Sequence, residues 1–269
     1  MNANPLAAIA IFAYLGSAIL IFKPLNLKTF DQDKSKRLAL TLAWGASTLH
    51  GLYIVLIATQ NTHFNFSFFS MASLVSLIVA LLLLLATLSK PFENLGIFLF
   101  PLTAFMLTLD LCFPEKQRSL DTHNWQMSTH ILSSIIAFSL LNIAAVQAVL
   151  LVIQNQQLRS HPPKRYIQSL PPLESMESLL FQVIGAGVFF LSISLASGFI
   201  FLEDIFAQHL AHKTIFSIAA WLIFSGLLVG RRRYGWRGLT AIKWTLLGFL
   251  SLLLAYFGSK LVMELILHR

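Results

Sequence analysis

The segment from Ala211 to Lys260 constrains the fold of this chain more than any other stretch. It contains two apolar runs, Ile215–Val229 and Leu246–Gly258, which are separated by a short basic segment. The basic side chains of that segment are Arg231, Arg232, Arg233, Arg237 and Lys243. Two apolar runs joined by a basic turn are typical of two membrane-spanning helices connected on the cytoplasmic side. The pattern therefore predicts a membrane location and the sidedness of the last two helices.

The composition places the whole chain in the same class of protein. Of its 269 residues, 57% are hydrophobic and 11% are charged, whereas a soluble domain carries about 25% charged residues. No polar segment is long enough to form a soluble module, so we expect residues 1–269 to form a single transmembrane bundle domain. The basic residues behind the net charge of +8 lie in short connections, which favours membrane lipid as a partner and argues against nucleic acid.

Eight apolar runs, the last two of them extended by semi-polar flanks, are long enough to cross a bilayer as helices. The first six are Pro5–Phe22, Leu38–Ala58, Phe69–Leu88, Leu95–Leu111, Met127–Ile153 and Glu177–Leu202, and the two runs named above complete the set. The first run lacks a basic n-region and a small-x-small cleavage site, so we interpret it as a retained helix. The predicted fold class is an all-α integral membrane protein, an eight-transmembrane-helix bundle.

The distribution of lysine and arginine predicts how the bundle is oriented. Fourteen of the nineteen Lys and Arg residues lie in the first, third, fifth and seventh connections between the predicted helices, and five lie on the opposite side. Basic connections of membrane proteins face the cytoplasm. Both termini are therefore predicted on the outer, periplasmic side of a multi-pass protein of the bacterial inner (plasma) membrane.

Several classes of enzyme are excluded by the residues that the sequence lacks. The chain has one cysteine, Cys112, so a membrane thiol–disulfide shuttle, which needs two, is excluded within one chain. The sequence contains no P-loop, no GxSxG, no HExxH and no dinucleotide-binding fingerprint. We therefore expect no catalytic residues and no free-standing enzyme activity.

An ionisable residue at membrane depth is costly, so each one is a candidate site. His50 lies near the middle of the second predicted helix, beside Gly51 and one turn from the small residues Ala46 and Ser47. One interpretation is an axial ligand of haem iron, because a neutral imidazole on a rigid helix ligates iron well. The other is a neutral histidine that hydrogen-bonds a Ser, Thr or carbonyl group of a neighbouring helix. The sequence leaves both interpretations open.

His130 begins a stripe of small residues at the outer end of the fifth predicted helix. Ser133, Ser134 and Ala137 follow it at i+3, i+4 and i+7 and so share its face. A planar macrocycle lying against this flat stripe would have its metal within reach of His130. Alternatively, the small residues allow another helix to approach closely, and His130 lies at the wet interface without a role.

His268, the penultimate residue, is predicted at the same membrane level as His130, so the two are candidates for a bis-imidazole pair on one metal. Against this, chain ends fray and an interfacial histidine needs no role. Seven of the eight histidines are predicted in the membrane or on its outer side, and His161 lies in a cytoplasmic connection. The candidate metal ligands are thus His130, His50 and His268, with Ser134 and Ala137 as further candidate cofactor-binding residues.

Three stretches resemble a family of membrane proteins. Thr129–Gln147 is similar to the family's helix in which a histidine precedes Ser-Tyr-Ala, with Ala137-Phe138-Ser139 in place of the tyrosine. Lys213–Phe224 is similar to Lys-x-x-x-Ser-x-x-x-Trp-Leu-x-Tyr, and Gly235–Gly258, which starts with Gly-Trp-Arg-Gly, is the most specific. These residues resemble the multi-span cytochrome c assembly proteins of the CcsA/HemX type, and within them the short inner-membrane branch called YpjD.

This resemblance implies haem handling. Members of the CcsA type move haem to the outer face of the membrane and present it for attachment to apocytochrome c. Their external histidine corresponds to His130 here, their second external histidine corresponds roughly to His268, and His50 has no counterpart that aligns. The resemblance implies haem as the cofactor, and a cytochrome c assembly protein or another membrane protein as the partner.

Two departures from the family pattern limit what the resemblance implies. The haem-presenting members carry a tryptophan-rich segment before the seventh helix, whereas Asp204–Lys213 contains no tryptophan. A histidine that is common just before the Gly-Trp-Arg-Gly turn is replaced by Arg231 here. The expected function is therefore a haem-associated inner-membrane factor in cytochrome c assembly or haem handling, without haem ligase activity.

A different class of function stays open: a non-haem transporter of a small solute or lipid, or a regulatory subunit of another membrane protein. A transporter is expected to have a broken helix or a buried charge pair near the middle of the membrane. The sequence indicates neither, because the deepest polar residues in this interpretation are His50 and Asn142. A regulatory subunit needs an intramembrane face for its partner, and the sixth predicted helix, rich in small residues, is a candidate.

Overall fold

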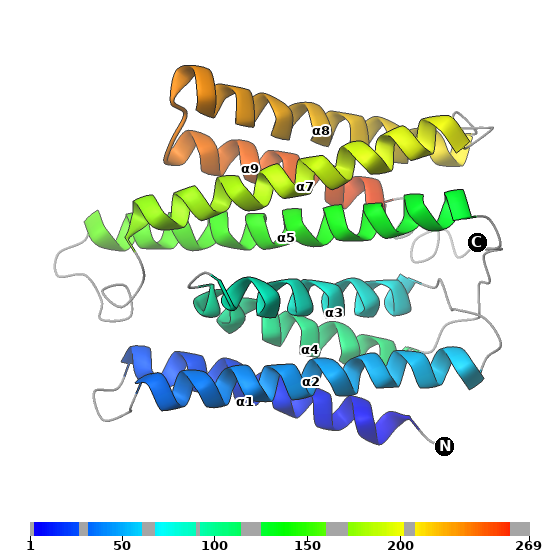
Figure 1. The fold of residues 1–269 in the computed structure, drawn as a ribbon, viewed down its shortest axis with the longest axis vertical. Coiled ribbons are helices and arrows are strands. Elements are labelled where there is room, and N and C mark those ends of the chain that lie inside the picture. Colours follow the sequence, from blue (N-terminus) through cyan, green and yellow to red (C-terminus); the bar gives the residue numbers. More distant parts are fainter. Residues whose placement is uncertain are drawn as a thin grey trace. The chain divides into compact units, whose positions relative to one another are not determined.

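The computed structural model describes residues 3–26, 32–60, 68–89, 92–113, 125–159, 172–201 and 208–258, which are almost entirely helical (Figure 1). The long helices are α1 (Asn4–Asn26), α2 (Gln32–Gln60), α3 (Phe68–Thr87), α4 (Gly96–Cys112), α5 (Trp125–Arg159), α7 (Leu173–Phe201), α8 (Gln208–Tyr234) and α9 (Leu239–Leu253). Two short helical turns, η1 (Glu93–Leu95) and η2 (Leu254–Gly258), adjoin α4 and α9. Within the described residues, eight helices are long and apolar enough to cross a membrane, which confirms the prediction of an eight-helix membrane protein.

The observed helices extend beyond the apolar runs that predicted them. The sequence interpretation ended the first helix at Phe22, but α1 continues through Pro24 to Asn26. It began the second helix at Leu38, whereas α2 begins at Gln32 and has Asp33 in its first turn. An acidic residue there stabilises the positive end of the helix dipole, and polar flanks outside the hydrocarbon remain good helix formers. Hydropathy therefore located the spans but not the helix ends.

The chain divides into two compact units, which we describe separately. Unit 1 comprises Met1–Leu120 and Gln157–Pro171, and unit 2 comprises Asp121–Gln156 and Pro172–Arg269. The single bundle domain over residues 1–269 stays a prediction.

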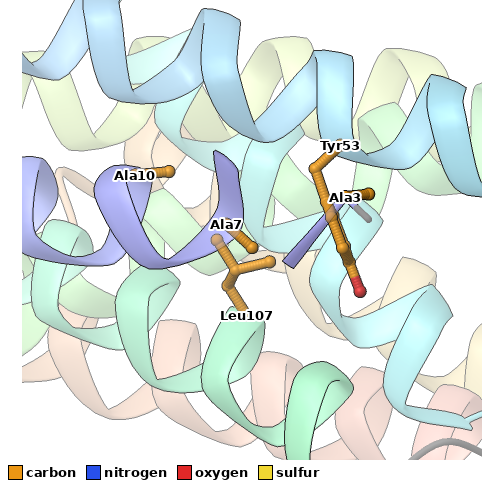
Figure 2. Packing of buried hydrophobic residues seen from close by; sticks show 5 residues of the cluster. All are labelled: Ala3, Ala7, Ala10, Tyr53 and Leu107. Carbon is orange, nitrogen blue, oxygen red and sulfur yellow. The ribbon is translucent and has the colours of Figure 1, made fainter. Parts of the chain in front are cut away.

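In unit 1, α1 packs against α2 and α4, and α3 packs against α2 and α4. Figure 2 shows the core between α1, α2 and α4, where Tyr53 of α2 and Leu107 of α4 meet Ala7 and Ala10 of α1 and Ala3, which directly precedes α1. The alanines at positions 3, 7 and 10 recur every three to four residues and are almost completely buried. Such small residues let helix backbones approach closely, which is how helices associate in lipid.

Polar side chains tie the helices of unit 1 together. Ser17 Oγ of α1 donates a hydrogen bond of 2.8 Å to the Ala39 carbonyl of α2. Ser35 Oγ of α2 donates one of 2.7 Å to the Leu20 carbonyl of α1. Lys36 of α2 forms an ion pair with Glu93 of η1. Because lipid offers no hydrogen-bond partners, such links specify which helices are neighbours.

Unit 2 contains most of α5 together with α7, α8 and α9, and α8 packs against both α7 and α9. Glycine permits close approach at two positions. A Cβ atom at Gly187 of α7 would lie 2.7 Å from Leu141 Cδ2 of α5, and one at Gly248 of α9 would lie 2.8 Å from Phe224 Cε2 of α8. Trp221 Nε1 of α8 also donates a hydrogen bond of 2.8 Å to Ser192 Oγ of α7. Glycine contacts and a partly buried indole hydrogen bond therefore help to hold unit 2 together.

Substituting Gly248 tests the packing of α8 against α9. We expect Gly248→Val to force the Phe224 ring away and to destabilise the protein by about 1–3 kcal/mol, the usual cost of overpacking. Gly226→Val on α8 is the matched control, because no atom lies within 4 Å of a Cβ atom added there. Thermal unfolding of the detergent-purified proteins, followed by circular dichroism, compares the two variants. Equal melting temperatures for both would contradict the packing described here.

Candidate functional site

His130 lies on the second turn of α5, and α7 fixes the orientation of its ring. His130 Nδ1 is 2.9 Å from the Ser194 carbonyl oxygen and 3.4 Å from Ser197 Oγ. A carbonyl oxygen only accepts hydrogen bonds, so Nδ1 carries a proton and donates it. In the neutral imidazole, Nε2 then carries the lone pair, and it makes no hydrogen bond to any described residue. His130 as a residue is partly exposed, and the arrangement offers one nitrogen of an oriented imidazole to a ligand.

The small residues that follow His130 on α5 pack against other helices of unit 2. Ser134 Oγ lies 2.5 Å from Ser194 Oγ of α7 and also hydrogen-bonds the Tyr256 hydroxyl of η2. Ala137 is fully buried, and the next residue, Phe138, packs against the Tyr256 ring at a centroid distance of 4.7 Å. The small residues therefore share one face of α5 as predicted, but side chains of the neighbouring elements pack against that face at Ser134 and Ala137. A macrocycle that lay on Ala137 would have to displace side chains of unit 2.

His50 is completely buried in unit 1. Its Nε2 atom lies 3.0 Å from Ser73 Oγ of α3, and the Tyr14 ring of α1 meets its ring edge-on at 6.1 Å. Tyr14 itself donates a hydrogen bond of 3.0 Å to Ser47 Oγ. The second ring nitrogen, Nδ1, has no hydrogen-bond partner among the described residues. This contact agrees with the second interpretation of His50 given above, in which a neutral histidine hydrogen-bonds a Ser, Thr or carbonyl group of a neighbouring helix.

Asp110, near the end of α4, is the polar residue that the sequence interpretation overlooked. Ser70 Oγ of α3 donates a hydrogen bond of 2.8 Å to Asp110 Oδ1. The hydroxyls of Tyr53 and Ser73 also hydrogen-bond its carboxyl group. Ser73 therefore links Asp110 to His50, and the network joins α2, α3 and α4. The signal in the sequence was one acidic residue inside an otherwise apolar run, at a depth where such residues usually have a function.

The structure brings some of the candidate residues together and leaves others undescribed. His50 lies in the unit 1 network, and His130 lies beside Ser134 in unit 2. Outside the described residues fall His63, His123, His161 and His268, and the side chains of His209 and His212 are not described either. Among the described residues, no group of three or more His, Cys, Asp or Glu side chains is placed to hold a metal ion.

A comparison with protein families decides what kind of protein this is. The sequence model of the family described as "Cytochrome C assembly protein" matches residues 36–267. The chain belongs to the cytochrome c assembly protein family. The match includes His50 and His130 and ends one residue before His268. The resemblance carried by the three sequence stretches is thus confirmed.

Curated relatives agree with this family. The chain is 28% identical to the inner membrane protein YpjD of Escherichia coli over 266 residues, which cover 97% of this chain and 98% of that protein. It is 27% identical to the cytochrome c biogenesis protein CcsA of Chlamydomonas reinhardtii over 143 residues, covering 52% and 39%. It is also 34% identical to an uncharacterised 28.8 kDa protein of Azospirillum brasilense over 140 residues, covering 51% and 52%. No solved structure matches the chain.

These matches and the eight spans identify the chain as a multi-pass inner-membrane protein of the cytochrome c assembly family. The predicted localisation and family are confirmed. In such a protein, two polar clusters are the candidate functional sites: the His130 cluster of unit 2 (His130, Ser134, Ser194, Ser197 and Tyr256) and the Asp110 network of unit 1 (His50, Tyr53, Ser70, Ser73 and Asp110).

Removing Ser73 tests whether the unit 1 network stabilises the protein. We expect Ser73→Ala to cost about 1–3 kcal/mol, because it leaves His50 Nε2 buried without a partner and removes one donor from Asp110. Ser76→Ala, one turn along α3, is the matched control. Ser76 is also buried, but it donates only to the Ser73 carbonyl of its own helix, 2.8 Å away.

The measurement is unfolding of both variants in mixed micelles, combined with the double variant His50→Leu, Ser73→Ala. Replacing both partners by apolar groups is expected to restore part of the lost stability. Additive losses in the double variant would show that His50 and Ser73 are not coupled.

Proposed function

We propose that this protein is a haem-associated inner-membrane factor that acts in cytochrome c assembly or haem handling, and that His130 is its first iron ligand. The observation that carries the proposal is the hydrogen bond of 2.9 Å from His130 Nδ1 to the Ser194 carbonyl. It leaves Nε2, the other ring nitrogen, as the lone-pair donor. The family supports the same function, since the Chlamydomonas relative is named as a cytochrome c biogenesis protein.

The donor chemistry at His130 fits haem. Iron in haem takes a neutral imidazole nitrogen, and metal-bound histidines usually donate their other N–H to a carbonyl or carboxylate. Ser194 supplies such a carbonyl, and Ser197 Oγ lies 3.4 Å from the same nitrogen. Haem, when bound, would supply an iron centre whose ligation and redox state depend on this imidazole. The chain's own residues orient the ring and fix its tautomer.

The remaining candidate residues have lesser roles in the proposal. His268 would provide the second imidazole of a bis-histidine pair with His130. His50 is the third candidate, because Ser73 already engages its Nε2 and only the buried Nδ1 is open to a ligand. Ser134 and Ala137 are buried by the packing of unit 2, so they would contact the macrocycle only where side chains of unit 2 move aside. The protein would bind haem without being a free-standing enzyme.

The orientation belongs to the same proposal. We infer that both termini lie on the outer side of the inner membrane, because most Lys and Arg residues fall in the alternate connections. The first turns of α5 would then lie at the outer interface, together with His130. Haem bound there would be accessible to partners outside the cytoplasm, among them other cytochrome c assembly proteins.

A second candidate function, transport of a small solute or lipid, is favoured by one observation. Asp110 is an acidic residue within a membrane span, and hydroxyls from α2 and α3 hydrogen-bond it. Polar networks of this kind mark solute or ion pathways in transporters. A transport role would be supported if Asp110→Asn abolished solute uptake by proteoliposomes while haem binding stayed unchanged.

Haem titration of the purified protein tests the proposed function. We expect a saturable Soret band for the wild type, and at least a tenfold weaker affinity for His130→Ala because the iron loses its ligand. His161→Ala is the matched control, since His161 lies in the connection predicted to face the cytoplasm. Free imidazole added to His130→Ala is expected to restore the spectrum, which a merely misfolded variant would not do.

Two outcomes would contradict the proposal at different levels. A wild-type protein that neither carries haem as purified nor takes it up would exclude haem binding and leave the family assignment intact. Haem binding with the same affinity and spectrum in His130→Ala would exclude His130 as the ligand. His50→Leu and His268→Ala would then identify which remaining candidate holds the iron.

A further inference from the structure

We propose that the turn between α8 and α9 is a binding site for the phosphate headgroup of an anionic phospholipid. The site is the basic turn surface, which we define by the side chains Arg232, Arg233, Arg237 and Lys243. All four are exposed. None of them forms an ion pair or hydrogen bond with another described residue, so their charges are available to an external anion. The proposal is independent of haem binding.

The backbone of this turn is held in one conformation. The Trp236 N–H donates a hydrogen bond of 3.2 Å to the Gly230 carbonyl near the end of α8, and Gly235, at φ 66°, follows the helix directly. Gly238 precedes α9 at φ 58° and ψ −129°, a conformation open only to glycine. The two glycines therefore fix the path of the turn, and a site built on it loses little entropy when a ligand binds.

Aromatic rings line one side of the same turn. Trp236 stacks on Trp244 at a centroid distance of 5.5 Å and on Tyr234 at 6.2 Å. Trp236 also covers Gly230, where a Cβ atom would collide with the indole. Tryptophan and tyrosine settle at the level of lipid headgroups because their rings are apolar with a polar edge. This ladder indicates that the basic turn surface lies where phosphates of the bilayer lie.

The fifth basic residue, Arg231, is used inside the protein. Its guanidinium donates to Glu177 Oε1 at 3.2 Å and lies 4.7 Å above the Phe181 ring. The Gly238 N–H donates to the same Glu177 oxygen at 3.2 Å. The Glu177 carboxylate, which lies beside this turn, is thus already hydrogen-bonded to Arg231 and Gly238. An internal anion neutralises Arg231 and leaves the basic turn surface uncompensated.

The uncompensated charges favour a lipid phosphate over a soluble one. Like charges on the turn and the adjoining helix ends repel each other, and a bound anion relieves that repulsion. Arginine binds phosphate oxygens with two parallel N–H donors, and lysine adds a point charge. Because the chain is an inner-membrane protein and the aromatic ladder adjoins the cations, phosphodiesters of anionic lipids are present at the site at high local concentration.

Lipid binding to the full-length protein in detergent tests the proposal. Phosphatidylglycerol is the probe, phosphatidylcholine is the zwitterionic comparison, and native mass spectrometry measures the bound lipid. We expect the wild type to prefer phosphatidylglycerol. The double variant Arg232→Gln, Arg233→Gln is expected to weaken that binding about tenfold or more, since each basic residue near an anionic lipid surface contributes favourably. Lys34→Gln, Arg37→Gln is the matched control. It also removes two exposed cations near a helix end, at the start of α2.

Each outcome bears on the proposal. Equal losses in both double variants would overturn it, because lipid would then respond to net charge alone. Inorganic phosphate that displaces the lipid at millimolar concentration would identify the site as one for soluble phosphate and overturn the lipid assignment. The single variants Arg237→Gln and Lys243→Gln, checked for unchanged helix content and melting temperature, are expected to give smaller losses. Wild-type affinity in all the variants of the turn would exclude the site.

Discussion

Polar side chains buried in a bilayer have only other protein groups as partners, and this constraint orders both units. In unit 1 the chain meets it with hydroxyls: Ser17 binds a carbonyl of α2, Ser73 binds His50, and Ser70 binds Asp110. Each link joins two different helices. In unit 2 the Ser194 carbonyl and hydroxyl meet two side chains of α5. Serine therefore supplies several of the hydrogen bonds that join neighbouring helices.

The same constraint distinguishes His50, which is buried among protein groups, from His130, which an external ligand can reach. His50 has one nitrogen bonded to Ser73 and one without a described partner, but no part of it is exposed. His130 also has one nitrogen engaged, yet its ring is partly exposed near the start of α5. An external ligand therefore reaches His130 without the loss of core packing that binding at His50 requires. Burial, rather than residue type, ranks the two candidates.

The sequence was sufficient to predict the membrane-spanning helices but not the hydrogen-bond networks between them. Runs of apolar residues predicted eight helices, because a span must be apolar over about 20 residues whatever its partners are. Asp110 was missed, since its hydroxyl partners come from two other helices and no periodicity in one helix reveals them. The partner of His130 is a backbone carbonyl, and every residue has one. The small-residue stripe at Ser134 was visible, but which group would cover it was not.

Helix α7 connects the two proposed sites within unit 2. Near its start Glu177 binds Arg231 beside the basic turn surface, and toward its end Ser194 binds His130. The two anchors are 17 positions apart along the helix, which at 1.5 Å per residue is about 26 Å. That is close to the hydrocarbon thickness of a bilayer, about 30 Å. If α7 spans the bilayer, the cation cluster and the imidazole would lie near opposite interfaces, and the proposed lipid phosphate and haem would bind toward opposite ends of one helix.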